Sequence, residues 1–301
     1  MSTDMSEAEV VDSVANHTKL SGIRSKLLSR NINTIYDMYE NLVRNYPLNS
    51  EEYNTTMEIL REEYFRPKYG DEYVLVIPKK HIIPHESDYT FFDTFGSFDQ
   101  KYMERIIHSD PDAYRMTYIR RSEAELNPKY VQVICCALLK CKDNKYIILR
   151  RKYGQFKGKL TLVMGHCAYE PSTYSFINYL FSQPCEYISE QKFRRLMSVD
   201  LTREIFEEVE LPSDTTVQMD ISEPSLYVPP AAMDPSNIAY YHLGFVYTMK
   251  LSCSSLKAFS GERELNDAII GTEEALSKLK REDTDGWLYD YLYRIGIIER
   301  P

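Results

Sequence analysis

A chain of 301 residues can form one large domain or two modest ones, and its core needs neither disulfides nor structural metal to be stable. The 36 basic and 45 acidic residues give a formal charge of -9, which argues against a general nucleic-acid or membrane-surface binder and requires local cations for any phosphorylated ligand. Six cysteines without CxxC spacing predict free thiols in a reducing compartment. No apolar run reaches membrane-span length and the acidic N-terminus has no signal-peptide pattern, so we expect a cytoplasmic protein.

The N-terminal part, residues 1–67, has apolar residues at helical spacing. This pattern predicts a small helical hairpin at 20–46, followed by a helix that begins at Ser50 or Asn54 and ends before Pro67. Basic side chains in the hairpin are compatible with binding to nucleic acid. The net negative charge of the whole chain makes this the weakest of the hypotheses. Simple packing or dimerisation is the alternative role of this region.

Strands dominate the sequence after this helical region. Apolar and β-branched runs predict strands at 73–78, 131–139, 146–149, 159–164, 217–221 and 240–251, and an aromatic segment with a glycine turn lies at 91–98. Helical spacing returns in a helix that ends at 211, and again at 272–280 and 285–297. Because strands and helices interleave without regular βα alternation, we predict an α+β fold rather than a doubly wound sheet.

The segment 201–211 places carboxylates on one side of a predicted helix. At 100° per residue, Glu204, Glu207 and Glu208 share roughly a quarter of the helix circumference, beside Arg203. The adjoining edge is apolar and consists of Leu201, Ile205 and Val209. Several carboxylates beside a phosphorylated substrate suit Mg²⁺ better than Zn²⁺. A salt-bridged surface helix is the alternative, because Arg203 and Glu207 have i,i+4 spacing.

A strand that ends at Gly165 precedes this helix, and the order of strand, glycine turn and RExxEE helix resembles the Nudix hydrolase family of MutT-like proteins. The family pattern is G-x5-E-x7-R-E-U-x-E-E-x-G-U, where U is a bulky apolar residue. Gly165 matches its first glycine, and its second half is matched by Arg203, Glu204, Ile205, Glu207, Glu208 and Leu211. The resemblance covers 131–301 and implies an α/β/α sandwich with a mixed sheet, preceded here by the small helical region.

The sequence departs from the family pattern between its two halves. Gly165 and Arg203 are farther apart than the pattern allows, which predicts an insertion at about 171–200. The isolated glutamate of the pattern falls on Pro171, with Glu170 one place short. Glu210 replaces the glycine that follows the helix, which costs a C-cap.

We call the matched motif from Gly165 to Leu211 the box. A box with such a long insertion resembles a Nudix subgroup described only as predicted phosphoesterases, and the upstream segments 72–77 and 120–125 support the same resemblance. Residues 68–130 are therefore expected to form an α/β lead-in that packs on the catalytic domain at 131–301.

The resemblance implies that water attacks phosphorus in a nucleoside diphosphate linked to another group, with Mg²⁺ as cofactor and Mn²⁺ as the alternative metal. Glu207 and Glu208 are the expected metal ligands, and the Gly165 carbonyl is a further one by family analogy. Glu204 is either a third ligand or the group that accepts the proton. Arg203 is expected to orient the carboxylates through a bidentate pair.

Cations beside the box are candidates for phosphate contact. They are Arg150 foremost, then Arg151, Lys152, Lys157 and Lys159, with His166 as a further substrate contact. A basic surface loop and a histidine satisfied by a backbone carbonyl are the alternatives. The general base is expected in the loop 260–267, with Glu264 preferred over Glu262, Glu273 and Glu274 because this loop follows the long strand.

Two classes of function remain open at this point. The first is a Mg²⁺-dependent pyrophosphohydrolase that acts on a nucleotide-type small molecule. The second is a catalytically weak or inactive Nudix-fold module with a nucleotide-binding or regulatory role. The altered box and the helical N-terminal region allow the second. Neither the identity of the nucleotide nor homodimerisation can be deduced from these residues.

Overall fold

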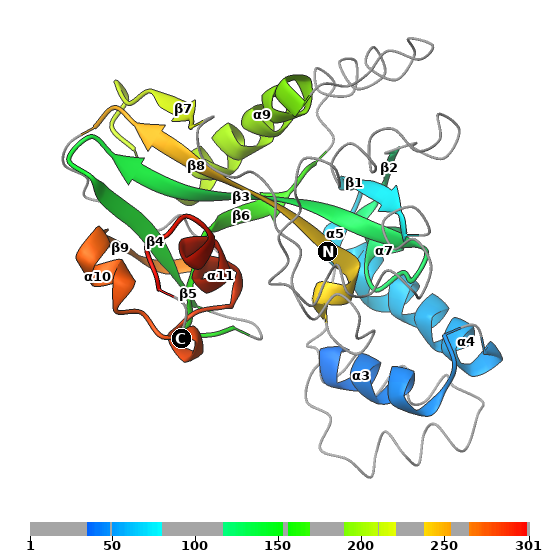
Figure 1. Ribbon diagram of the computed structural model, residues 1–301. Coiled ribbons are helices and arrows are strands. Elements are labelled where there is room, and N and C mark those ends of the chain that lie inside the picture. Colours follow the sequence, from blue (N-terminus) through cyan, green and yellow to red (C-terminus); the bar gives the residue numbers. More distant parts are fainter. Residues whose placement is uncertain are drawn as a thin grey trace. The chain divides into compact units, whose positions relative to one another are not determined.

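The computed structural model describes residues 35–48, 50–79, 117–152, 156–168, 190–209, 211–220, 238–253 and 265–299 (Figure 1). These fall into two compact units. The first unit takes its described residues from within 1–80, 116–132 and 231–242, and the second takes them from within 133–230 and 243–301. No helix of these described ranges is long and apolar enough to cross a membrane. The aromatic segment at 91–98, the start of the 20–46 hairpin and the box positions 170, 171 and 210 lie outside them. The three-part division at 67 and 130 stays a prediction.

Short helices and an antiparallel pair of strands make up the first unit. Its elements are α3 (Ile35–Asn45), α4 (Glu51–Leu60), the π-helix η1 (Arg61–Phe65), α5 (Arg66–Tyr69), β1 (Tyr73–Pro78), β2 (Thr117–Arg120), α7 (Arg121–Ala124) and the 3-10 helix η5 (Ile238–Tyr241). Ser50 caps α4, because its side-chain oxygen accepts a hydrogen bond from the Tyr53 backbone N–H at 3.2 Å. β1 pairs with β2 in antiparallel register, with Tyr73 opposite Arg120.

The prediction that helix ends before Pro67 is wrong. Helical structure continues through η1 into α5, where Pro67 stands in the first turn. The wider π-helical turn at Arg61–Phe65 precedes it, so the helix readjusts before the proline and ends only at Gly70, whose φ is 55°.

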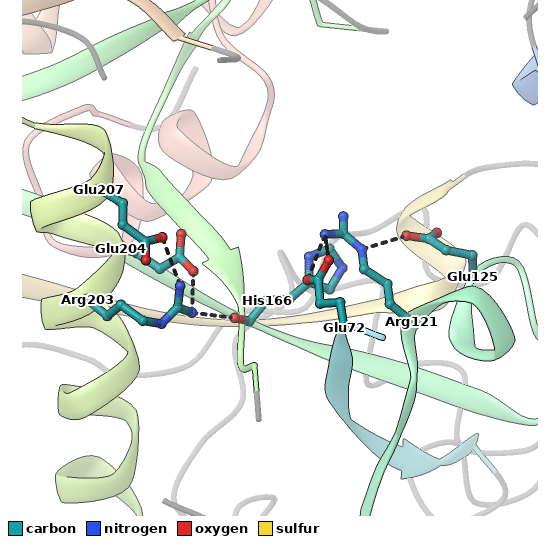
Figure 2. A network of polar contacts seen from close by, with 7 residues as sticks. All are labelled: Glu72, Arg121, Glu125, His166, Arg203, Glu204 and Glu207. Atoms are coloured by element: carbon teal, nitrogen blue, oxygen red, sulfur yellow. Dashed lines mark hydrogen bonds and ion pairs between the residues drawn. The ribbon is translucent and has the colours of Figure 1, made fainter. Parts of the chain in front are cut away.

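An ion-pair network joins β1 to α7 within this unit (Figure 2). The Arg121 guanidinium donates to both carboxylate oxygens of Glu72, at 2.9 and 3.1 Å, and to Glu125 at 3.2 Å. It also lies 4.2 Å from the centroid of the Tyr69 ring. Burial lowers the pKa of Arg121, but the Glu125 and Glu72 carboxylates and Tyr69 outweigh it and raise this pKa overall. The 120–125 segment singled out in the sequence therefore holds a strand to a helix.

Aromatic side chains fill the core of the first unit and enclose a lysine. Tyr39, Tyr53 and Tyr241 are at most 2% exposed. The Tyr53 hydroxyl donates to the Leu126 carbonyl at 3.1 Å. Lys79 follows β1 and is 7% exposed; its Nζ lies over the Tyr240 ring and donates to the Tyr240 carbonyl at 2.7 Å. The core thus contains an amine whose protonation costs free energy.

Replacing Lys79 with methionine is expected to change how stability depends on pH. Burial lowers the pKa of Lys79 to about 6, whereas an unfolded lysine titrates near 10.5. Between these values the unfolded chain holds a proton that the folded chain lacks, so the free energy of unfolding rises with pH by up to about 1.4 kcal/mol per unit. Urea denaturation at pH 6.5–9 should show a slope about 1 kcal/mol per unit smaller in Lys79→Met. Lys68→Met, which removes an exposed amine from the Tyr64 and Tyr69 rings, should keep the wild-type slope. Equal slopes in all three proteins would contradict the prediction.

The second unit is built on antiparallel strands. Its elements are β3 (Tyr130–Cys141), which begins in the first unit, then β4 (Lys145–Arg151), β5 (Leu160–Thr161), β6 (Val163–His166), α9 (Glu190–Glu208), β7 (Val217–Met219), β8 (His242–Leu251), β9 (Leu265–Thr272), α10 (Glu273–Ser277), the 3-10 helix η6 (Arg281–Asp283) and α11 (Trp287–Arg294). The pairs β3–β4, β3–β6, β4–β5, β4–β9 and β7–β8 are antiparallel. Helices interleaved with an antiparallel-rich sheet confirm the predicted α+β class.

Several predicted elements have different bounds in this unit, and the helix predicted to end at 211 ends at Glu208. The predicted strand at 159–164 is divided into β5 and β6 around Leu162, and the predicted strand at 240–251 starts with the 3-10 helix η5. Residues 265–267 of the predicted loop belong to β9, which pairs with β4. The alternation of apolar and polar residues along a strand shows which side chains are buried. It does not show where the hydrogen-bond ladder between two strands is interrupted.

The two faces of β3 have different surroundings. Ile134, Cys136 and Leu138 belong to an apolar cluster that includes Leu288 and Tyr291 of α11. Cys135 lies on the other face of β3, where its thiol donates to the Gly165 carbonyl of β6 at 3.5 Å. All five described cysteines, at 135, 136, 141, 167 and 253, are free. One strand therefore supports the core on one side and the glycine of the box on the other.

Candidate active site

The box helix α9 is longer than predicted at its N-terminal end. It begins at Glu190, so residues 190–200, which the sequence assigned to the insertion, form its first turns. Leu201, Ile205 and Val209 are completely buried, which confirms the predicted apolar edge. Burial of this edge fixes the rotation of the helix and turns the charged edge toward β6.

Arg203 connects two carboxylates of α9 to β6 (Figure 2). One terminal nitrogen lies 2.8 Å from Glu207 Oε2, and the other lies 2.6 Å from Glu204 Oε1. The second nitrogen also donates to the backbone carbonyl of His166 at 3.2 Å. The predicted orienting pair is therefore a fork across two glutamates with a third bond to the strand.

Gly165 stands directly against the carboxylate of Glu204. A Cβ built on this glycine would overlap with the Cδ and both oxygens of Glu204. The glycine is held in place because β6 pairs with β3, with Gly165 opposite Cys135. Glycine at this position thus leaves room for the Glu204 carboxylate, and the side chain of any larger residue would fill that room.

Charge is unevenly balanced at this end of α9, where the Arg203 guanidinium contacts two of the three box carboxylates. Burial lowers the pKa of Arg203, but Glu204 and Glu207 outweigh it and raise this pKa, so the arginine stays charged. Glu204 is 9% exposed, and the side chain of Glu207 is 56% exposed. Glu208 has one carboxylate oxygen buried. The cluster keeps a net negative charge that one arginine does not cancel.

The donor set suits a hard divalent cation. Every candidate ligand is an oxygen, and the Glu204 carboxylate lies in the space at Gly165 that a Cβ would fill. Within the described ranges, however, no three His, Cys, Asp or Glu side chains already converge as a metal site. Glu207 would have to turn from Arg203 toward a cation. The chemistry of Glu204, Glu207 and Glu208 fits Mg²⁺, and the ligand set stays a prediction.

The predicted phosphate contacts divide into two groups. Arg150 donates to the Gly158 carbonyl at 2.9 Å, and Lys159 donates to the Glu282 carbonyl, so both brace loops. Arg151 donates instead to the Met164 sulfur at 2.8 Å, next to the box glycine. His166 contributes its backbone carbonyl to Arg203. The preference for Arg150 over Arg151 therefore has no support in these contacts.

The candidates for the general base lie in different surroundings. Glu262 and Glu264 are outside the described residues. Glu274 is exposed and pairs with Lys278 at 2.7 Å, and Glu273 accepts from the Tyr146 hydroxyl at 3.5 Å. The role of Glu264 as general base stays a prediction. Glu274 forms an exposed ion pair with Lys278 on the surface.

Asp285 is a half-buried carboxyl that sequence reasoning missed. Its side chain accepts hydrogen bonds from the Thr161 hydroxyl and from the Leu288 backbone N–H, the latter at 3.2 Å. Burial raises the pKa of Asp285, and the bonds from Thr161 and Leu288, with the charge of Arg151, oppose that rise. The available signal was an aspartate three residues before an apolar helix position, which is the spacing of an N-cap.

The solved structures that resemble this chain are Nudix proteins of low sequence identity. No protein-family model and no curated protein sequence matches the chain. Its structural neighbours are Nudix hydrolases and MutT proteins. Tm1382, a candidate Nudix hydrolase, is 16% identical with a TM-score of 0.41, over 73% of this chain and 95% of its own.

Two further Nudix neighbours are similarly distant. The MutT protein of Methanosarcina mazei is 13% identical over 55% of this chain and 92% of its own, with a TM-score of 0.34. The Nudix domain of Shewanella oneidensis NrtR, solved with ADP-ribose, is 13% identical over 67% of this chain and 96% of its own, with a TM-score of 0.30. These neighbours agree with the resemblance found in the sequence, and likenesses of this size carry no inference about substrate, metal or activity.

Proposed function

We propose that this chain is a Mg²⁺-dependent Nudix pyrophosphohydrolase that cleaves a nucleoside diphosphate linked to another group. The observation that carries the proposal is the placement of Arg203, which binds Glu204 and Glu207 while Glu204 lies against the backbone of Gly165. An ordinary i,i+4 surface pair needs neither the glycine nor the bond to the next strand. The box residues matched in the sequence are thus in mutual contact across two elements.

The residues suit an attack of water on phosphorus. A diphosphate repels anions, and Mg²⁺ held by Glu204, Glu207 and Glu208 would neutralise its oxygens and lower the pKa of a bound water. Arg203 keeps the Glu204 carboxylate turned toward β6 through the 2.6 Å contact. Gly165 leaves room for the Glu204 carboxylate against its backbone, since no side chain fills that space. Glu204 is the carboxylate best placed to hold a proton or a cation at this turn.

A panel of substrates tests the proposal. We expect Mg²⁺-dependent release of a mononucleotide from at least one of ADP-ribose, a nucleotide sugar, a dinucleoside polyphosphate, a dinucleotide cofactor, an oxidised nucleoside triphosphate or capped RNA. Excess EDTA should stop release, and Mg²⁺ or Mn²⁺ should restore it. Chromatography of the products is the measurement, and the circular dichroism spectrum with EDTA is the control for folding. No release from any compound with either metal would contradict the proposal.

One observation favours a second candidate, a nucleotide-binding module with little turnover. Glu207 is paired with Arg203, and the carboxylates of the described residues do not already converge on one point. Tight binding of a panel compound without release of product would identify this function. The same titrations therefore separate an enzyme from a binding protein.

A further inference from the structure

The C-terminal ends of β3 and β8 each carry a free cysteine. Cys141 is the last residue of β3, and Cys253 lies two residues beyond the end of β8. β8 pairs with β3 in the second unit, and the arrows of these two strands in Figure 1 point the same way, so the pair is parallel. Two thiols that are far apart in the sequence thus lie at the same end of the sheet.

The backbone places these two cysteines opposite each other. The Lys142 N–H donates to the Cys253 carbonyl at 3.4 Å. In a parallel ladder an N–H bonds to the carbonyl of the residue that precedes its opposite neighbour, so this bond sets Cys141 opposite Cys253. Neighbouring strands lie roughly 4.8 Å apart, and disulfides join Cα atoms roughly 4.4–6.8 Å apart. The spacing of the strands therefore permits a disulfide here.

The chain remains extended past the end of β8. The Ser252 N–H donates to the Thr216 carbonyl at 3.0 Å, which continues the antiparallel pairing of β8 with β7. On the other side, the Cys253 carbonyl accepts from Lys142 of the β3 end. Because neighbours on both sides hold the backbone, the alternation of side chains extends to Cys253.

Both thiols belong to the same face of the sheet. Val246 of β8 packs in the same apolar cluster as Cys136 and Leu138 of β3, together with residues of α11. The even-numbered residues of both strands therefore point toward α11. Since side chains alternate along a strand, the odd-numbered Cys141 and Cys253 share the opposite face.

The two thiols differ in their surroundings. Cys141 is 6% exposed, whereas Cys253 is half-buried and can be reached by a small reagent. Burial is the main reason why the pKa of Cys141 rises to about 12; Cys253 and Asp143 add to this rise, and Lys145 opposes it. Cys141 therefore stays protonated near neutral pH. Because the thiolate is the form that attacks a disulfide, we expect Cys253 to react first.

We propose that Cys141 and Cys253 form a redox-sensitive site, which a low-molecular-weight disulfide converts into an intrachain disulfide. The Cys253 thiolate attacks one sulfur of the reagent RSSR, forms a mixed disulfide and releases RS⁻. The Cys141 sulfur then attacks the Cys253 sulfur, and its proton leaves with the second RS⁻ as RSH. Two protein thiols are oxidised, and the reagent is reduced to two thiols. This step does not depend on hydrolysis at the box.

The disulfide would close a loop of more than a hundred residues that contains α9 and the box. A cross-link restricts the unfolded chain more than the folded chain, and this effect grows slowly with the length of the loop. Oxidation is therefore expected to raise the melting temperature by about 5–10 °C.

Cystamine, a small disulfide, tests the site on the full chain at about pH 8. The product is mapped by mass spectrometry of its peptides under non-reducing conditions, and we expect Cys141 linked to Cys253 in the wild type. Cys141→Ser should trap the mixed disulfide on Cys253, because the second attack is lost. Cys253→Ser should leave Cys141 reduced. The melting temperature should rise after treatment of the wild type and stay unchanged in both variants.

Cys185→Ser is the matched control, since Cys185 is the sixth cysteine of the chain and lies outside the described residues. It should form the same link between Cys141 and Cys253 as the wild type, with the same rise in melting temperature. A mixed disulfide that persists on Cys253 in the wild type, or a link from Cys253 to Cys185, would overturn the proposal.

Discussion

Replacement of Glu204 with glutamine is expected to lower turnover of the panel substrate by about 10² to 10³, because one fixed anionic oxygen at the reacting centre is lost. Glu204 is the buried member of the carboxylate cluster and contacts both Arg203 and the backbone of Gly165. Glutamine has nearly the same shape and still accepts from Arg203. The fold should therefore persist, with a change in unfolding free energy below about 2 kcal/mol.

Single-turnover kinetics at saturating Mg²⁺ measure this loss. Glu207→Gln should act in the same direction with a smaller effect, because its side chain is 56% exposed and solvent can replace part of its role. Glu62→Gln is the matched control, since Glu62 forms a comparably exposed pair with Arg66 in the first unit. It should leave turnover unchanged. Equal rates for Glu204→Gln and Glu62→Gln would show that the box carboxylate takes no part in the chemistry.

Periodicity predicted the parts of the site that depend on burial. The apolar edge of Leu201, Ile205 and Val209 fixes how α9 rotates, and this edge is visible in the sequence because a helix repeats every 3.6 residues. The same rotation brings Arg203 within reach of Glu207 at i,i+4. The relation of Gly165 to Glu204 followed only from the family pattern, since nothing local to either residue reveals the other.

Irregular features of the chain escaped prediction for a common reason. The bulge at Arg150 and Arg151 arises from pairing with β9, more than a hundred residues later, so the different contacts of these two adjacent arginines could not be read from the sequence. Pro67 predicted a helix end, but a π-helical turn before it accommodates the ring. Asp285 acquires its environment from Thr161, which lies in a distant strand. Each of these features depends on contacts that no local spacing encodes.

Replacement of Gly165 with alanine is expected to reduce kcat/KM at least tenfold while leaving the melting temperature within a few degrees of wild type. The added methyl group would occupy the space of the Glu204 carboxylate. The backbone of β6 is held by its ladder with β3, so the flexible glutamate moves instead. Displacement of a reacting group by about 1 Å can cost up to about 10²-fold in rate, whereas moving the end of a side chain costs little stability.

Gly244→Ala is the matched control, because it adds the same methyl group to another strand glycine. There the new Cβ would meet the large ring of Trp287, the first residue of α11, which packs against the apolar cluster of that helix. Overpacking of this kind costs roughly 1–3 kcal/mol, so Gly244→Ala should lower the melting temperature and leave kcat/KM of the folded protein nearly unchanged. A double-mutant cycle sharpens the test: Glu204→Asp, which shortens the side chain, should cost less in the Gly165→Ala background than alone. Additive effects would mean that the glycine acts on something other than the carboxylate.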